Sequence, residues 1–159
     1  MSKIKVAVVF GGRSTEHEIS LISSEGILKH INRSLFEVIP LRIDIGGHWF
    51  LQDTENTHDK VGTSVTLIQG EKGAAVLENG SGKILREIDI VFPVLHGVFG
   101  EDGTIQGMLK MLNVAFVGCG VLASATCMDK DVTKRLLRDA NIAIAPYVCA
   151  TWTHQPHFE

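Results

Sequence analysis

Two short segments combine acidic or imidazole side chains with several glycines, each directly after a run of apolar residues. In the first segment, Gly11 and Gly12 follow an apolar run and lead to Glu16. In the second, His96 ends an apolar run and precedes residues 97–103, which contain three glycines and two carboxylates. Carboxylate and imidazole groups bind cations and carry protons, and glycines let a backbone approach a ligand closely. Two such loops meeting in one crevice predict a ligand site.

Glu16 lies where a helix is expected to start. The N–H groups and the dipole at a helix N-terminus stabilise an ionised carboxylate, so Glu16 suits a cationic ligand better than a phosphate. A dinucleotide-binding fingerprint would need glycine in place of Arg13 and Glu16, and no Gly-Lys-Ser/Thr closes a phosphate-binding P-loop. In the alternative interpretation, Glu16 only stabilises the first turn of the helix, as acidic residues commonly do.

His96 is open to two interpretations. It either satisfies a backbone carbonyl at the end of a buried strand, or serves as a donor or proton carrier in the crevice. The loop that follows favours the second, because three glycines in seven residues cost more conformational entropy than a simple connection requires. Glu101 and Asp102 either belong to the site or only start the next helix, and for Asp102 we favour the capping role.

Lys130 lies at the expected front of another helix, where the dipole disfavours a cation and a bound anion would compensate it. The alternative is an ordinary surface lysine. His154 and His157 have the spacing of metal ligands on a helix, but Pro156 separates them, and we expect this polar tail to be disordered. No metal site is therefore predicted in this chain.

Composition limits the class of protein. The 159 residues, 45% hydrophobic and 21% charged, are enough for one full domain and part of a second. A formal net charge of −3 gives no support to a nucleic-acid partner. The three cysteines are an odd number without C-x-x-C spacing, which argues against a disulfide framework and a zinc ribbon. No leader or membrane span is apparent, so we expect a cytoplasmic protein.

Strand and helix patterns alternate along the chain. The apolar runs predict strands at 5–10, 36–43, 88–95 and 115–117, and helical spacing predicts helices at 16–31, 104–112, 121–128 and from Asp129 to about 140. Pro40 predicts that its strand lies near a sheet edge or that the proline lies near the strand's end. Between residues 44 and 89 we expect small hairpins and loops.

Three of the predicted helices have specified buried faces. Helix 104–112 is expected to be one-faced, burying Ile105, Met108, Leu109 and Leu112. Helix 16–31 is expected to bury Ile19, Ile22, Ile27 and Ile31 behind an N-cap at Ser14 or Thr15, and the helix after Asp129 to bury Val132, Leu136, Leu137 and Ala140. The alternation predicts an α/β fold with an open, mostly parallel, doubly wound sheet. Ligands of such sheets bind at the carboxyl ends of the strands, where both glycine-containing loops would lie.

Three long segments together resemble one family. Residues 10–20 (FGGRSTEHEIS), 95–118 (LHGVFGEDGTIQGMLKMLNVAFVG) and 124–147 (SATCMDKDVTKRLLRDANIAIAPY) are similar to the D-alanine–D-alanine ligases of the ATP-grasp superfamily. The resemblance implies a Rossmann-like, pre-ATP-grasp substrate-binding domain over residues 1–125. It also implies the truncated beginning of the ATP-grasp central domain over residues 126–159.

The resemblance also implies a reaction and roles in it. In that family ATP phosphorylates the carboxylate of the first D-alanine, the amine of the second attacks the acyl phosphate, and the dipeptide serves peptidoglycan synthesis. Carried over, Glu16 would hold the ammonium group of the first D-alanine, with His96 beside the same molecule. Lys130 would reach the ATP phosphates, and Ser20 and Glu101 would support the substrate site.

The cofactors implied are ATP and Mg²⁺, although the family's magnesium ligands and most of its ATP site lie beyond the matching region. We therefore expect the chain to be the N-terminal part of a ligase, left by truncation or proteolysis near residues 151–159 and inactive alone. A homodimer through the N-terminal domain is also implied. The alternatives are a ligase that joins D-alanine to D-lactate or D-serine, and a non-catalytic binding module with the same fold.

Overall fold

The computed structural model describes residues 2–52, 57–58 and 62–150. His154 and His157, considered above as metal ligands, lie outside these residues. The described chain forms an eight-stranded sheet in the order β6-β5-β4-β3-β2-β1-β7-β8. The strands are β1 (Ile4–Gly11), β2 (Phe36–Ile43), β3 (Trp49–Leu51), β4 (Thr63–Gln69), β5 (Ala74–Glu78), β6 (Ile84–Ile88), β7 (Ile90–Pro93) and β8 (Ala115–Phe116).

Strand β1 lies at the centre of the parallel half of the sheet, between β2 and β7. Its residues from Val6 to Phe10 are all buried, because helices cover both faces. Ala7 and Val9 join one hydrophobic cluster, while Val6, Val8 and Phe10 join the other. The expected α/β class, with an open parallel sheet, is confirmed for this half, which also carries both glycine-containing loops.

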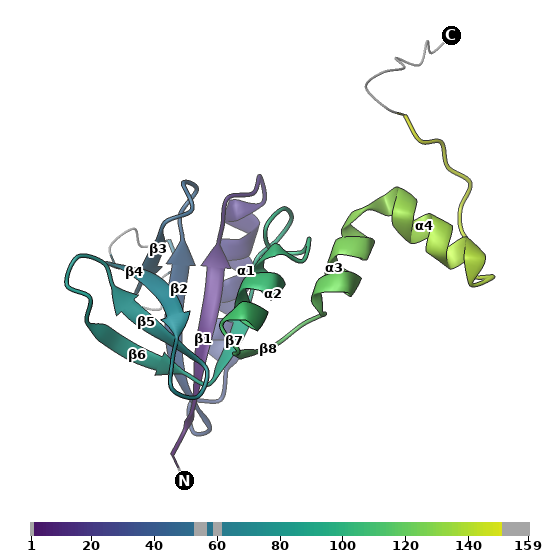
Figure 1. Ribbon diagram of the computed structural model, residues 1–159. Helices are drawn as coiled ribbons and strands as arrows, with labels where there is room; N and C mark the ends of the chain where they lie inside the picture. The colour runs from purple at the N-terminus through teal and green to yellow at the C-terminus, as the bar shows by residue number, and fades with distance from the viewer. Residues whose placement is uncertain (1, 53–56, 59–61, 151–159) are drawn as a thin grey trace.

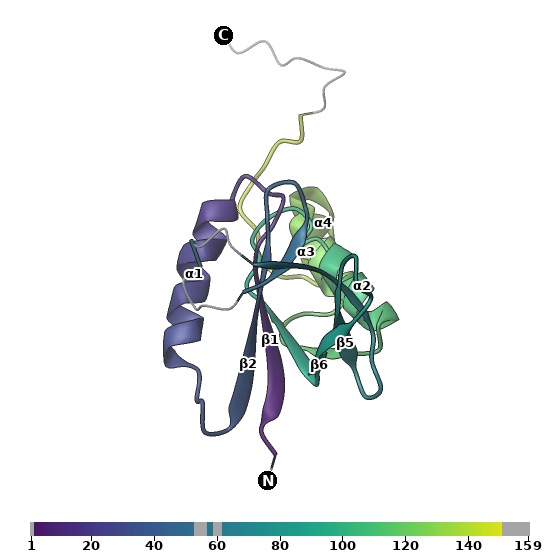
Figure 2. The same cartoon turned by 90° about the vertical axis from the view of Figure 1, so that its left-hand side faces the viewer.

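Two helices cover the sheet from opposite sides, as Figure 2 shows. Helix α1 (His17–His30) packs on the face that contains Val8 and Phe10. Helix α2 (Thr104–Met111) buries Ile105 and Leu109 in the other cluster, with Met108 and Leu112 packed against it. The predicted one-faced helix at 104–112 is therefore confirmed.

The predicted buried face of α1 was wrong in part. Ile19 and Ile22 are 52% and 57% exposed, and the buried positions are Ser20, Leu21, Ser24 and Leu28. Small serine side chains let the helix lie close to the strands, where the Ser20 hydroxyl bonds to Gly11 and Val94, while the Ser24 hydroxyl donates to the Leu21 carbonyl within the helix. The predicted N-cap was also wrong, because Glu16 occupies the N-cap position and no side chain caps it.

Neither expectation for Pro40 was correct. Strand β2 lies inside the sheet, and Pro40 pairs with Val8 in the middle of the strand. The ladder to β3 includes only residues 41–43 of β2, and the Pro40 carbonyl accepts the Gln52 amide at its end, at 3.0 Å. The missing proline N–H therefore costs one hydrogen bond at the end of a short ladder rather than one within it.

The segment predicted as small hairpins and loops extends the same sheet. Strands β3 to β6 pair antiparallel in sequence order, beginning on β2. The strand predicted at 88–95 is divided, since Ile88 ends β6 and Asp89 precedes β7. Asp89 exchanges backbone and side-chain hydrogen bonds with Lys5 at the start of β1. This break turns the chain from the antiparallel half into the parallel half.

Beyond β8, helices α3 (Val121–Met128) and α4 (Lys130–Asp139) extend away from the sheet (Figure 1). Asp129 caps α4, because its carboxylate accepts the amides of Asp131 and Val132. The predicted apolar stripe of α4 is not buried in this structure, where Val132 and Leu136 are 40% and 53% exposed. Helix α4 therefore contributes no residue to the core.

Candidate functional site

The two glycine-containing loops meet at the carboxyl edge of the parallel strands. Strands β1 and β7 are direct neighbours, so the loops that follow them start side by side. The buried Ser14 joins the loops: its hydroxyl donates to the His96 carbonyl oxygen at 2.7 Å and accepts the Glu16 amide at 3.1 Å. Glu16 and His96 are thus held through one side chain.

The Glu16 carboxylate faces the second loop rather than its own helix. No side chain caps α1, so this carboxylate does not bond the first-turn amides. It lies against Gly97, where a Cβ atom would be 2.5 Å from Glu16 Oε2. Gly97 has a φ of 68°, a conformation that favours glycine, and a side chain at this position would displace the Glu16 carboxylate. Within the described parts of the chain, no hydrogen bond or ion pair engages the Glu16 carboxylate.

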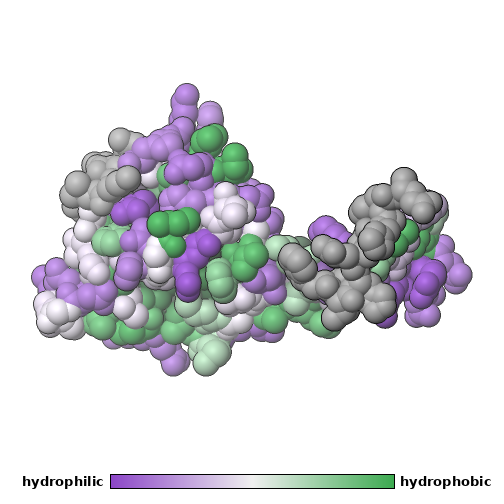
Figure 3. Space-filling view, turned by 90° about the horizontal axis from the view of Figure 1, so that it is seen from above, coloured by the Kyte–Doolittle hydropathy of each residue, from purple (hydrophilic) through white to green (hydrophobic). Residues whose placement is uncertain are grey.

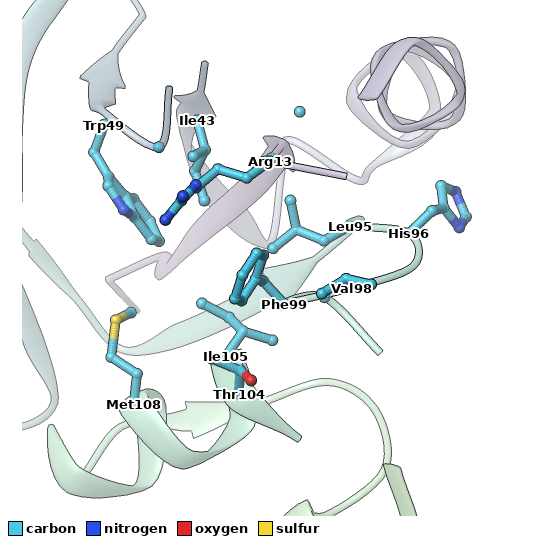
Figure 4. Close-up of a pocket in the computed structure, with 14 residues that line it drawn as sticks. Arg13, Ile43, Trp49, Leu95, His96, Val98, Phe99, Thr104, Ile105 and Met108 are labelled. Atoms are coloured by element: carbon cyan, nitrogen blue, oxygen red, sulfur yellow. The ribbon is translucent and has the colours of Figure 1, made fainter. Parts of the chain in front are cut away.

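His96 lies on the same side of its loop as Glu16. Its Nε2 atom and the hydroxyl of Ser23 are 3.0 Å apart and share a hydrogen bond. Ser23 follows Glu16, the N-cap residue of α1, by seven residues, which places both on one side of the helix. Figure 4 shows the half-buried His96 ring on the side of α1, directed away from the other labelled side chains. The carboxylate and the imidazole therefore both lie between α1 and the second loop.

Ser20, predicted as a supporting residue, is fully buried beneath this site. Its hydroxyl accepts the Gly11 amide at 2.8 Å and donates to the Val94 carbonyl at 2.6 Å. It therefore joins α1 to the ends of β1 and β7. Its contacts are those of a positioning residue, which holds the two loops at a fixed spacing.

Glu101 and Asp102 shape the second loop. Glu101 accepts the Gly97 amide at 2.7 Å, and Asp102 accepts the amides of Phe99 and Thr104, each at 2.9 Å. Partial burial alone would raise the pKa of the Asp102 carboxyl, but these backbone donors outweigh it and hold that pKa below its ordinary value of 3.8. Asp102 bonds the first residue of α2, but the favoured capping role is not confirmed, because the N-cap position is Gly103 and no side chain caps this helix.

Lys130 is not brought to this edge of the sheet. It is exposed at the start of α4, and its ammonium group donates to the Cys127 carbonyl at 2.8 Å. Figure 1 shows α4 well to one side of the loops that carry Glu16 and His96. Lys130 can act together with Glu16 and His96 only if α4 is arranged differently relative to the sheet, or if a further part of the protein takes part.

Sequence reasoning missed two contributors to the site. Ser14 was considered only as an N-cap, and Ser23 was not considered. The signal for Ser23 was its spacing, because a residue seven positions after Glu16 on a helix returns to the same face. No comparable sequence pattern indicates the role of Ser14, because its hydrogen-bond partner is a backbone carbonyl 82 residues away.

Among residues 2–52, 57–58 and 62–150, no group of three or more His, Cys, Asp or Glu side chains is arranged to hold a metal ion. In the same residues, no helix combines the length and apolar character that a membrane crossing requires.

Comparison with known proteins gives a consistent picture. The family described as "D-ala D-ala ligase N-terminus" matches residues 5–119. D-alanine–D-alanine ligase A of Escherichia coli K12 is 44% identical over 162 aligned positions, which cover 95% of this chain and 44% of the relative. The chain thus spans less than half the length of the curated relatives that it matches.

Solved structures agree with the sequence comparison. A D-alanine-D-alanine ligase from Coxiella burnetii superposes with a TM-score of 0.84 at 33% identity, covering 92% of this chain and 44% of that one. The VanG D-Ala:D-Ser ligase from Enterococcus faecalis superposes with a TM-score of 0.78 at 36% identity, covering 90% and 43%.

Proposed function

The chain belongs to the D-alanine–D-alanine ligase family, of which it matches the N-terminal part, and we propose that it forms the D-alanine-binding edge of such a ligase. The full protein joins two D-alanine molecules with ATP, through an acyl phosphate, and supplies the dipeptide for the bacterial cell wall. Residues 1–125 are the substrate-binding domain in this proposal, and residues 126–159 begin the ATP-binding central domain.

The observation that carries the proposal is the Glu16 carboxylate. It lies at the start of α1 without capping the helix and faces Gly97 of the second loop. Within the described residues no cationic side chain pairs with this carboxylate, so an ammonium group is the natural partner. The amino group of a small zwitterion such as D-alanine provides that partner.

His96 acts beside Glu16 in this proposal. The Ser23 hydroxyl bonds its Nε2 atom and the Ser14 hydroxyl bonds its backbone carbonyl, so one bond orients the ring and the other fixes the backbone that carries it. A ring held in this way presents its other nitrogen in one orientation to hydrogen-bond the bound D-alanine or move a proton. Ser20 and Glu101 keep the two loops in place around the substrate.

ATP and Mg²⁺ are the cofactors of the proposed full-length reaction. ATP supplies the phosphoryl group that activates a carboxylate for amide formation, and Lys130 is the residue of this chain proposed to contact its phosphates. The described residues hold no acidic cluster that fits a magnesium ion. A magnesium site therefore has to come from residues other than these.

We also propose a homodimer in the cytoplasm. The exposed Ile19 and Ile22 side chains of α1 offer apolar surface on the N-terminal domain, in agreement with the dimer that the family resemblance implies. Light scattering coupled to size-exclusion chromatography distinguishes the dimer from a monomer.

Calorimetric titration of D-alanine tests the role of Glu16. We expect Glu16→Gln to weaken D-alanine binding roughly tenfold, since a hydrogen bond to a charged group contributes about 1.5–3 kcal/mol. Glu18→Gln is the matched control: Glu18 is an exposed carboxylate in the same first turn of α1, and its loss should change the affinity by no more than about twofold. If the two variants weakened D-alanine binding equally, Glu16 would be only a helix stabiliser.

A ligase with D-serine as second substrate is the other candidate, favoured by the similarity to VanG. Both candidates use D-alanine first, so both need Glu16 and His96 in the same roles. A product assay of the full-length protein with D-alanine and D-serine in competition separates them, and we expect D-alanyl-D-alanine as the main product.

A further inference from the structure

A cavity opens at the same edge of the sheet, on the side of α2. It has a volume of about 150 Å³ and a mostly apolar lining that includes Trp49, Leu95, Phe99, Ile105 and Met108. In Figure 4 these side chains come from three separate parts of the fold and surround one space. A cavity of about 150 Å³ is large enough for a single benzene ring.

Arg13 supplies a positive charge to this cavity. Its guanidinium lies 5.2 Å from the centre of the Phe99 ring, and its aliphatic stem packs so closely on Gly47 that a Cβ atom there would lie 2.5 Å from Arg13 Cδ. Neither an acidic side chain nor any hydrogen-bond acceptor pairs with Arg13 in the part of the chain that the structure describes. The side chain is therefore held in place while its charge remains available.

The backbone conformation of Phe99 is unusual for an aromatic residue and favours a ligand-binding role for its ring. Its φ of 68° is a conformation that glycine adopts freely and a bulky aromatic residue rarely does. The side chain is still 43% exposed, so little core burial offsets the strain. Strained backbone of this kind gathers at ligand-binding positions, and here it directs an aromatic ring to the mouth of the cavity, against Arg13.

This cavity is distinct from the Glu16 side of the loops. His96 borders both, but its ring lies on the α1 side and is directed away from the cavity (Figure 4). The charge on the α1 side is the carboxylate of Glu16, whereas the charge on the α2 side is the guanidinium of Arg13. The two sides therefore select opposite ends of a ligand, and the methyl group of D-alanine is too small to fill the apolar cavity.

We propose that this cavity is a second binding site, which takes a small carboxylate bearing one aromatic ring. The ring enters the apolar space between Trp49, Ile105 and Met108, and the carboxylate pairs with Arg13 at the mouth. This site goes beyond the proposed ligase function, because it uses neither Glu16 nor a D-amino acid.

Phenylacetate and its neutral analogue 2-phenylacetamide test the proposal, with backbone and side-chain NMR of this chain as the readout. We expect phenylacetate to bind with a Kd of about 1 mM, as its ten heavy atoms allow. Shifts should concentrate on Arg13, Trp49, Phe99 and Met108. The amide should bind roughly fivefold more weakly, because it cannot form the partly exposed ion pair.

Two variants and a competitor complete the test. Arg13→Gln should bind phenylacetate and phenylacetamide equally, and Phe99→Asn, which tolerates the same φ, should bind both weakly while keeping the wild-type fold. Adding D-alanine should leave the affinity for phenylacetate unchanged, and so should the substitution Glu16→Gln. A failure of the ligase proposal would therefore not affect this test. The proposal is overturned if the amide binds wild-type protein as well as the acid, if the shifts lie elsewhere, or if 10 mM phenylacetate causes no shifts, since about 1 mM is expected.

Discussion

Glu16 and Glu18 are two carboxylates in the same turn that differ in what surrounds them. Glu18 is exposed in the first turn of α1, beside a hollow whose lining includes Arg42 and Asp44. Glu16 lies against the backbone of a loop that begins about eighty positions later in the chain. Charge and helix position alone could not separate the two, because the decisive neighbour, Gly97, is distant in sequence.

The Asp102 carboxyl provides a prediction about pH. Its pKa in the folded protein is lowered, since the amides of Phe99 and Thr104 outweigh the effect of burial. A lowered pKa stabilises the fold at pH values above the ordinary 3.8, and this contribution is lost as the pH falls through the folded-state pKa. Asp102→Asn should therefore be less stable than wild type at neutral pH, with the difference shrinking below pH 3.8.

Urea unfolding followed by circular dichroism at a series of pH values measures this difference. A constant difference in unfolding free energy between neutral pH and pH ~2.5, which lies below the ordinary aspartate pKa, would contradict the role given to Asp102. In that case the glycines, and not the Asp102 carboxylate, would determine the conformation of the second loop.

At the scale of elements, hydroxyl groups add to the apolar packing that holds α1 and the loop before it against the sheet. Ser14 bonds the loop that carries His96, and Ser20 bonds the ends of both neighbouring strands. The predicted stripe of isoleucines missed this arrangement because hydrophobic periodicity scores serine as polar. Buried serines with two backbone partners follow no periodic pattern in the sequence, so this part of the site could be identified only from the structure.

Ser20→Ala tests the attachment. The substitution leaves the Gly11 amide and the Val94 carbonyl without their partner in a buried place, which should lower the free energy of unfolding by about 1–3 kcal/mol. Ser24→Ala is the matched control, because Ser24 is equally buried but its hydroxyl donates only to the Leu21 carbonyl within the helix.

Chemical denaturation of the two variants gives the comparison. We expect Ser24→Ala to cost less than about 1 kcal/mol, the net value of one ordinary hydrogen bond. If both variants lost the same free energy of unfolding, α1 would be held by apolar packing alone, and Ser20 would not position the loops.

At the scale of the whole molecule, the parallel half of the sheet could be predicted from sequence and the antiparallel half only in pieces. Residues 5–10 are a continuous apolar run, which marks a strand buried on both faces. The short strands β3 to β6 resemble any series of hairpins, and nothing local shows that they continue the same sheet. The site depends on the predictable half, since Glu16 and His96 both follow its strands.

The structure also predicts uneven stability. Strand β1 is buried throughout its apolar run, whereas α4 has no buried residue. From above, the α3–α4 segment projects to one side of the sheet domain (Figure 3). We expect the amides of α4 to exchange with solvent through local opening, while those of β1 exchange only on global unfolding.

Native-state hydrogen exchange at increasing denaturant concentration distinguishes these two modes. Exchange of α4 amides should be independent of low denaturant concentrations, and exchange of β1 amides should follow the global transition. Protection of α4 equal to that of β1 would show that α4 is part of the cooperative core and that its apolar stripe has a partner.

The most direct test of the proposed function is an experimental structure of the protein with D-alanine bound. We predict that the ammonium nitrogen lies within about 3 Å of a Glu16 carboxylate oxygen, the distance of a charge-assisted hydrogen bond, with the His96 ring beside the same molecule. D-alanine bound elsewhere, with the Glu16 carboxylate facing only solvent and Gly97, would contradict it.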